Sequence, residues 1–316
     1  MDFPAAPRAG RRVSFGAVVV LALFLLLAPP LFLLAPFVLL TLFSRPRTLR
    51  ELLWLVAAAT GAGLALQGPH DLPVEIMWAS ALVLAAVFLV LSLRSETPAF
   101  GRALLAVFVT TIAVGAWEWS RGVTWPAVQH AFATTLREGY QAMLPPPAAG
   151  TAPRTDLQNF IQPFMDSASD QARAMPGILM LEGLAGVLLA WSWHHRIAAQ
   201  RLGPAPAPFR RFRFNDQLIW GAIFTLAVLV LPLPAEAKAV AENILVLGIG
   251  IYAMRGLAIA VAILSPGPTG FKVLVSGMAI LLIPLTLGVC LALGLADTWL
   301  DIRGRLTAPA SGGSPK

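Results

Sequence analysis

The chain has 316 residues, of which 57% are hydrophobic and 12% are charged, and its mean hydropathy is +0.74. Soluble domains carry about twice that share of charged residues, so too little polar surface is left here to cover a water-soluble globule. The apolar residues fall in runs of about 20, the length that a helix needs to cross a bilayer. We therefore predict an all-α, polytopic transmembrane helical bundle.

The formal net charge of +7 does not indicate a nucleic-acid partner, because the basic residues stand in short loops beside apolar runs. Cytoplasmic loops of membrane proteins collect Lys and Arg in this way. We therefore predict a multi-pass protein of the bacterial cytoplasmic (inner) membrane with a cytoplasmic N-terminus. The single cysteine, Cys290, lies in an apolar run and excludes an intrachain disulfide.

The first apolar run, 13–43, is too long for one span, and Pro29 and Pro30 at its middle lack amide donors. We expect a tight helical hairpin or two short spans there. Segment 118–176 has nearly balanced charge and holds two amphipathic patterns, the second beginning at Thr155, so we expect an extracytoplasmic helical insert. The other expected spans are about 52–66, 74–93, 103–117, 176–193, 217–233, 239–264 and 273–296.

This pattern predicts eight or nine spans. The side of the C-terminus stays open, because Arg303 and Arg305 do not favour an outer tail. The expected organisation is a six-span unit 1–198 that includes the insert, a basic cytoplasmic loop 199–216, a three-span unit 217–306 and a flexible tail 307–316.

Polar residues at membrane depth are costly and are candidates for ligand binding. Glu182 lies about two turns into its span if the helix begins at Pro176; the alternative is a shallow, hydrated structural carboxylate. Asn243 is either a ligand contact or, as we favour, an interhelical hydrogen-bonding residue. The outer end of the span at 103–117 carries aromatic and acidic residues that form either an interfacial belt or a binding mouth closed by the amphipathic helices: Trp117, Glu118 and Trp119.

The basic loop carries three arginines that we assign to lipid or partner contact: Arg210, Arg211 and Arg213. Arg255 falls near the inner end of its span, where its side chain is expected to snorkel to water or to contact a lipid phosphate or a partner. Asp297 and Asp301 share a helix face, but pairing of Asp301 with Arg305 is a commoner arrangement than a metal site.

No metal site or cofactor is expected. His194 and His195 are adjacent, so they point about 100° apart on a helix and cannot chelate one ion together. The sequence has no Walker A, HExxH or GxSxG motif. We therefore do not expect an enzyme, and any use of ATP would need a separate partner subunit.

Three stretches resemble the YybS-like family of bacterial membrane proteins: PFRRFRFNDQLIWG (208–221), AENILVLGIGIYAMRGLAIA (241–260) and GLADTWLDIRGRL (294–306). The resemblance implies a membrane location, with no established activity, and marks as motif positions Gly256, Asp297, Asp301 and Arg303. More distantly, the first six spans are similar in layout to the substrate-binding subunits of energy-coupling-factor transporters.

These observations lead to two functional hypotheses. The first is a transport subunit that captures a small, partly apolar molecule or a lipid. The second is a membrane scaffold or assembly factor whose basic loop binds anionic lipid or a protein partner.

Overall fold

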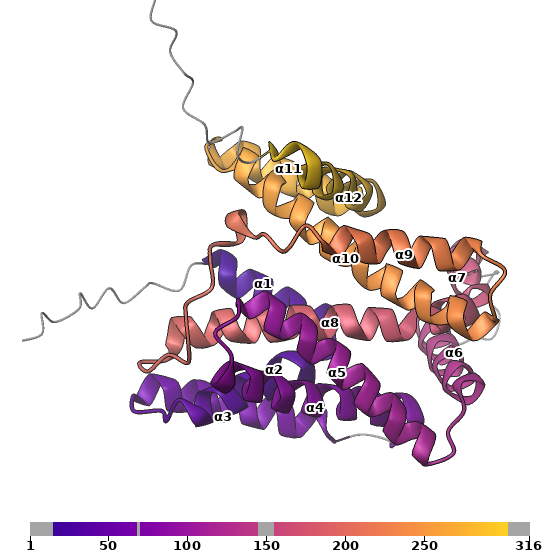
Figure 1. Cartoon of the computed structure of the whole chain (residues 1–316), viewed down its shortest axis with the longest axis horizontal. Coiled ribbons are helices and arrows are strands. Elements are labelled where there is room, and N and C mark those ends of the chain that lie inside the picture. Colours follow the sequence, from indigo (N-terminus) through magenta and orange to yellow (C-terminus); the bar gives the residue numbers. More distant parts are fainter. Residues whose placement is uncertain (1–14, 68–69, 145–154, 303–316) are drawn as a thin grey trace, which may run out of the picture. The chain divides into compact units, whose positions relative to one another are not determined.

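The computed structural model describes residues 15–67, 70–144 and 155–302, and within these ranges every regular element is a helix, as predicted (Figure 1). The predicted tail 307–316 lies outside them. The chain divides into two units, each assembled from two separate stretches. Unit 1 is Met1–Ala131 with Glu182–Pro206, and unit 2 is Phe132–Leu181 with Ala207–Lys316.

Unit 1 is a bundle built around a short apolar helix, α2. Its helices are α1 (Phe15–Leu27), α2 (Leu31–Phe43), α3 (Leu49–Ala65), α4 (Leu72–Arg94), α5 (Ala99–Ser120) and the C-terminal part of α8 (Ala168–Ile197). The break between α1 and α2 falls at the two prolines, which confirms two short helices in place of one long span.

The core of unit 1 forms where small residues let helices approach closely. A methyl group added at Gly186 of α8 would lie 2.6 Å from the carbonyl oxygen of Phe32, and one added at Gly183 would lie 2.8 Å from the side chain of Leu84. Both glycines therefore allow close helix packing. Gly63 of α3 has no such role within unit 1, because no atom lies within 4 Å of a methyl group added there.

Unit 2 contains the remaining helices: α6 (Trp125–Ala142) from Phe132 onward, α7 (Thr155–Asp166), the start of α8, the short 3-10 helix η1 (Phe209–Arg211), α9 (Leu218–Val230), α10 (Ala235–Leu264), α11 (Thr269–Leu281) and α12 (Ile283–Leu300). The two expected amphipathic helices are α6 and α7. The Tyr140 hydroxyl donates to Gln171 at 2.6 Å, and Arg137 donates to Ser169 at 2.8 Å, so both bonds tie α6 to the start of α8.

Two expected spans differ from the structure. The run at 273–296 is not one helix, because the chain breaks at Leu282 and Pro284, which has no amide donor, opens α12. Helix α8 begins at Ala168 and continues through Pro176 over 30 residues. Glu182 therefore lies halfway along α8, deeper in its helix than a start at Pro176 would put it.

Five helices of the described residues are long and apolar enough to cross a membrane: α4, α5, α8, α10 and α12. Four further apolar segments are shorter: Ala17–Leu27, Leu31–Phe43, Leu218–Val230 and Gly270–Leu281. A 13-residue helix such as α9 extends about 20 Å, which falls short of the roughly 30 Å of hydrocarbon. Helix length thus supports five of the eight or nine predicted spans. The remaining predicted spans correspond to shorter helices.

Candidate functional site

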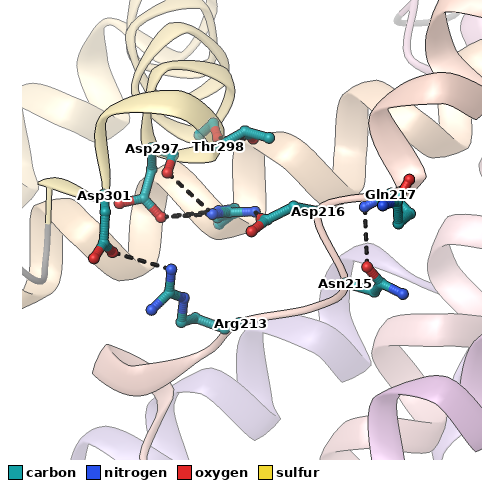
Figure 2. A network of polar contacts seen from close by, with 9 residues as sticks. Arg213, Asn215, Asp216, Gln217, Asp297, Thr298 and Asp301 are labelled. Atoms are coloured by element: carbon teal, nitrogen blue, oxygen red, sulfur yellow. Dashed lines mark hydrogen bonds and ion pairs between the residues drawn. The ribbon is translucent and has the colours of Figure 1, made fainter.

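A buried arginine occupies the centre of a charged network in unit 2 (Figure 2). Arg255 of α10 is 0% exposed, and its Nε donates to a carboxylate oxygen of Asp297 on α12 at 2.9 Å. Its Nη1 donates to Asp216, just before α9, and its Nη2 donates to the main-chain carbonyl of Asp297. Because the Asp297 side chain is also 0% exposed, this ion pair is fully removed from solvent.

The network corrects the expectation that Arg255 reaches water. A guanidinium can stay buried only where carboxylates and carbonyls satisfy its donors, and here two acids from other parts of the chain do so. Asp216 was not among the predicted site residues. It follows Asn215 in the predicted motif, but no local spacing links it to an arginine 39 residues later.

The same network anchors the basic segment that precedes α9. Arg213 donates to Asp301 at 3.0 Å, and the Phe214 ring packs edge-on against Tyr252 with 5.2 Å between centroids. Asp301 therefore pairs with Arg213; its predicted partner Arg305 lies outside the described residues, as does Arg303. Arg210 and Arg211 are exposed in η1. Arg210 and Arg211 are thus exposed next to an anchored stretch of backbone.

Helices α10 and α12 cross so closely that only glycine fits at positions 256 and 294. A methyl group added at Gly256 would overlap the carbonyl oxygen of Cys290, and one added at Gly294 would overlap that of Tyr252. The contacts pair 256 with 290 and 252 with 294, so the helices run antiparallel. This crossing brings Arg255 and Asp297 together and gives Gly256 a packing role.

Asn243 joins α10 to α8 by inserting its amide into the backbone of α8. Its Oδ1 accepts from the amide of Gly177 at 2.7 Å, and its Nδ2 donates to the carbonyl of Arg173 at 3.1 Å. In an uninterrupted helix these two backbone groups bond to each other. The amide is therefore committed to an interhelical role, as favoured, and has no free group for a ligand.

The residues at the C-terminal end of α5, which are predicted from the sequence to lie outside, separate into exposed and buried ones. Trp119 is 81% exposed, and the Trp117 ring lies 4.7 Å from the guanidinium of Arg121, so both suit an interfacial belt. Glu118 is 5% exposed, and neither of its carboxylate oxygens has a hydrogen-bond partner. Within the described residues its ion pair is a long one, 3.7 Å to Arg121, whose shorter 2.7 Å contact goes to Glu75.

Glu118 is one of several buried polar groups in unit 1 without hydrogen-bond partners. Three of them lie on α5, eight residues apart along the helix: Arg102, Thr110 and Glu118. The Nε and Nη2 atoms of Arg102 are unpaired, and its guanidinium lies 4.8 Å from the Trp191 ring. The others are Thr41, Ser92, Trp191, Trp193 and His194. Arg102 stands one residue before the expected span 103–117, so the sequence did not place it among the buried residues.

The histidines lie at the same end of unit 1 as Arg102. His194 is 0% exposed, and His195 lies within 3.0 Å of the Trp191 carbonyl and 3.3 Å of the Gly203 carbonyl. Neither histidine is solvent-exposed. Among the described residues, no group of three or more His, Cys, Asp or Glu side chains is arranged to hold a metal ion.

Glu51 fixes the loop that follows α8. It lies in the first turn of α3, before the apolar run, and accepts from the amides of Arg47, Thr48 and Ala199. Burial opposes its ionisation, but these bonds and one from the Thr48 hydroxyl outweigh it and lower the pKa of Glu51 to about 2. The carboxylate is therefore ionised at neutral pH, and its acceptors are used within the protein.

Comparison with known proteins gives one match. A model of the family described as predicted membrane protein (DUF2232) matches residues 16–298, a range that includes the Arg255 network and nearly all of the five long helices. Searches of curated proteins and of solved structures found no match, so neither a YybS-like protein nor a transporter subunit is identified among relatives. Family and long apolar helices together make this a multi-pass membrane protein, and the chain belongs to the DUF2232 family of predicted membrane proteins.

Proposed function

We propose that unit 1 is the ligand-binding part of a membrane transport subunit that captures a small, partly apolar molecule or a lipid. The observation that carries the proposal is a set of three buried residues of α5, the α5 polar residues. The Nε and Nη2 atoms of Arg102, the Thr110 hydroxyl and both carboxylate oxygens of Glu118 lack hydrogen-bond partners, although the Arg102 Nη1 donates to the Ser95 carbonyl. A buried polar group without a partner costs about 1–3 kcal/mol, so each one needs a compensating role. A ligand with polar groups along an apolar body would supply the missing partners.

The contrast between the two units supports this reading. The buried polar side chains Asn243, Arg255 and Asp297 of unit 2 all make hydrogen bonds, whereas the unpaired buried atoms of the described residues lie in unit 1, apart from the Tyr252 hydroxyl. Packing therefore does not require orphaned polar groups in this fold. Their concentration in unit 1 favours a binding role there.

Glu118 defines the chemistry of the ligand's polar end. An ionised carboxylate only accepts hydrogen bonds, so it selects a group that donates them, such as an amine or a hydroxyl. Glu182, partly buried in α8, belongs to the same unit and is a second acidic candidate. The sequence motifs for ATP hydrolysis are missing, so the proposal includes a separate ATPase partner to drive uptake.

The substitution Glu118→Gln tests the proposal. It retains the shape of the side chain but removes its charge, and we expect about 10- to 100-fold weaker retention of the native ligand, the cost of losing a charged hydrogen bond. The measurement is mass spectrometry of small molecules that co-purify with the protein in nanodiscs. Glu75→Gln is the control, because Glu75 pairs with the same Arg121 but is part-exposed. Equal ligand recovery from wild type and Glu118→Gln would contradict the proposal.

The anchored basic segment favours a second function, a scaffold that binds an acidic protein partner. Ion pairs fix Arg213 and Asp216, so the backbone beside Arg210 and Arg211 is anchored while their side chains stay exposed. An anchored backbone binds with a smaller entropy cost than a mobile loop.

The double substitution Arg210→Gln/Arg211→Gln tests the scaffold function and leaves the Arg213 ion pair intact. We expect cross-linked partner recovery from native membranes to fall about tenfold, because rim charges mainly set association. Arg47→Gln/Arg94→Gln removes two other exposed arginines and should leave recovery unchanged. Unchanged recovery with the first pair would mean that these arginines only set topology.

A further inference from the structure

An open groove lies in unit 1 between the end of α2 and the loop that follows α8. Its volume is about 580 Å³, and its lining residues are Phe43, Ser44, Arg45, Gln200, Arg201 and Leu202. Two arginines and two large apolar side chains thus face one hollow. Such a lining matches an amphiphile with an anionic head better than a fully polar or fully apolar ligand.

We propose that this groove binds the phosphate of an anionic phospholipid, with Arg45 and Arg201 on the phosphate and Phe43 and Leu202 beside the glycerol and the first acyl carbons. Arginine suits this role because its planar guanidinium binds phosphate oxygens through two donors at once. The groove is separate from the three α5 polar residues, and the proposal does not depend on the transport function.

The charge of the groove is not neutralised by the protein. Within the described residues, the ion pairs engage Arg121, Arg213 and Arg255, and no acid lies within ion-pair distance of Arg45 or Arg201. Glu51 holds the same loop, and its carboxylate accepts hydrogen bonds from four donors, none of them an arginine side chain. Arg102 lies under the loop, with its Nη1 3.8 Å from a methyl group built at Gly203, and adds a third cation without an ion pair in the described residues.

Both walls of the groove are fixed before any lipid binds. Arg45 has a φ of +55°, a left-handed value that is unfavourable for a residue with a long side chain. Strained backbone of this kind is common at ligand-binding sites. The opposite wall is tied down at Ala199 by Glu51 and at Gly203 by His195. The fixed backbone keeps both arginines beside one hollow, so ordering of the loop adds little to the entropy cost of binding.

The surroundings favour a lipid over a soluble phosphate ester. Phe43 is exposed at the end of an apolar helix, and Leu42 beside it is exposed as well. Arginines that follow such helix ends lie at the level of the lipid headgroups. A phosphate at that level with an acyl chain beside it fills both halves of the groove, whereas a free phosphate leaves the apolar half in water.

The test uses the full-length protein in detergent and native mass spectrometry with equal amounts of phosphatidylglycerol and phosphatidylcholine. The double variant Arg45→Asn/Arg201→Gln removes both charges, and asparagine tolerates the positive φ at position 45. We expect about tenfold or greater loss of retained phosphatidylglycerol, with phosphatidylcholine unchanged. If the double variant does not fold, Arg201→Gln alone, at a loop position without backbone strain, should still reduce retention several-fold.

Two controls decide between explanations. Arg50→Gln/Arg94→Gln makes the same change in net charge at two exposed residues of unit 1 that do not line the groove, and it should retain phosphatidylglycerol as wild type does. An equal loss in this control would mean diffuse surface attraction and would overturn the proposal. Displacement of the lipid by millimolar inorganic phosphate or glycerol 3-phosphate would assign the groove to a soluble phosphate and would overturn the lipid identification.

Discussion

Replacing Asp297 with alanine should destabilise unit 2 by about 3–5 kcal/mol, the typical cost of leaving one partner of a buried ion pair uncompensated. The Arg255 guanidinium would stay at 0% exposure with only Asp216 as a carboxylate partner. Cys290 is the single cysteine of the chain and is buried at the crossing of α10 and α12, so its rate of maleimide labelling reports opening of this unit. The expected increase in that rate is about two to three orders of magnitude.

The control for this experiment is Asp301→Asn. Arg213 and Asp301 are about half exposed, and an exposed pair contributes only about 0–1 kcal/mol, so labelling should change little. The double variant Arg255→Met/Asp297→Leu removes both charges and should recover much of the stability lost in Asp297→Ala. If the double variant labels as fast as Asp297→Ala, the position is sensitive to shape and not to an uncompensated charge.

The second large effect is expected from Gly256→Ala. The added methyl group would overlap the Cys290 carbonyl, which belongs to backbone and cannot move aside as a side chain does. The helices would have to separate, and we expect a loss of about 3 kcal/mol or more, at the upper end of overpacking effects. Thermal unfolding in nanodiscs and Cys290 labelling both measure it.

Gly248→Ala is a matched control on the same helix. No atom lies within 4 Å of a methyl group at Gly248, so alanine should be neutral there or stabilise α10 by up to about 1 kcal/mol. The same tight crossing predicts that Gly294→Ala behaves like Gly256→Ala. Similar melting temperatures for Gly248→Ala and Gly256→Ala would be incompatible with the close approach of α10 and α12.

Helix content and several boundaries follow from the sequence because they depend on local chemistry. The prolines at 29 and 30 break the first apolar run, and the amphipathic spacing of α6 and α7 is readable without knowledge of their neighbours. The continuation of α8 through Pro176 was not readable. The side-chain amide of Asn243 bonds backbone groups of α8 next to this proline. Asn243 lies 66 positions beyond Gly177, so no local pattern reveals the contact.

For the candidate site, too, the sequence shows local features but not the contacts between distant residues. Hydropathy marks Arg255 as costly at membrane depth but does not name its partners, because Asp216 and Asp297 lie 39 and 42 positions away. Arg102 was attributed to a cytoplasmic loop because a basic residue next to an apolar run has the same local pattern in either setting. Which helices pair decides whether such a cation is buried, and a single sequence carries little of that information.

Because each unit is made of two stretches, the order of synthesis matters. Arg102 emerges from the ribosome 89 residues before Trp191, the aromatic ring against which its guanidinium lies. At about 5–20 residues per second, some 4–18 seconds separate the two residues during translation. Through that interval the nascent α5 carries a cation whose aromatic neighbour has not yet been made, and only the arrival of α8 completes the surroundings of Arg102.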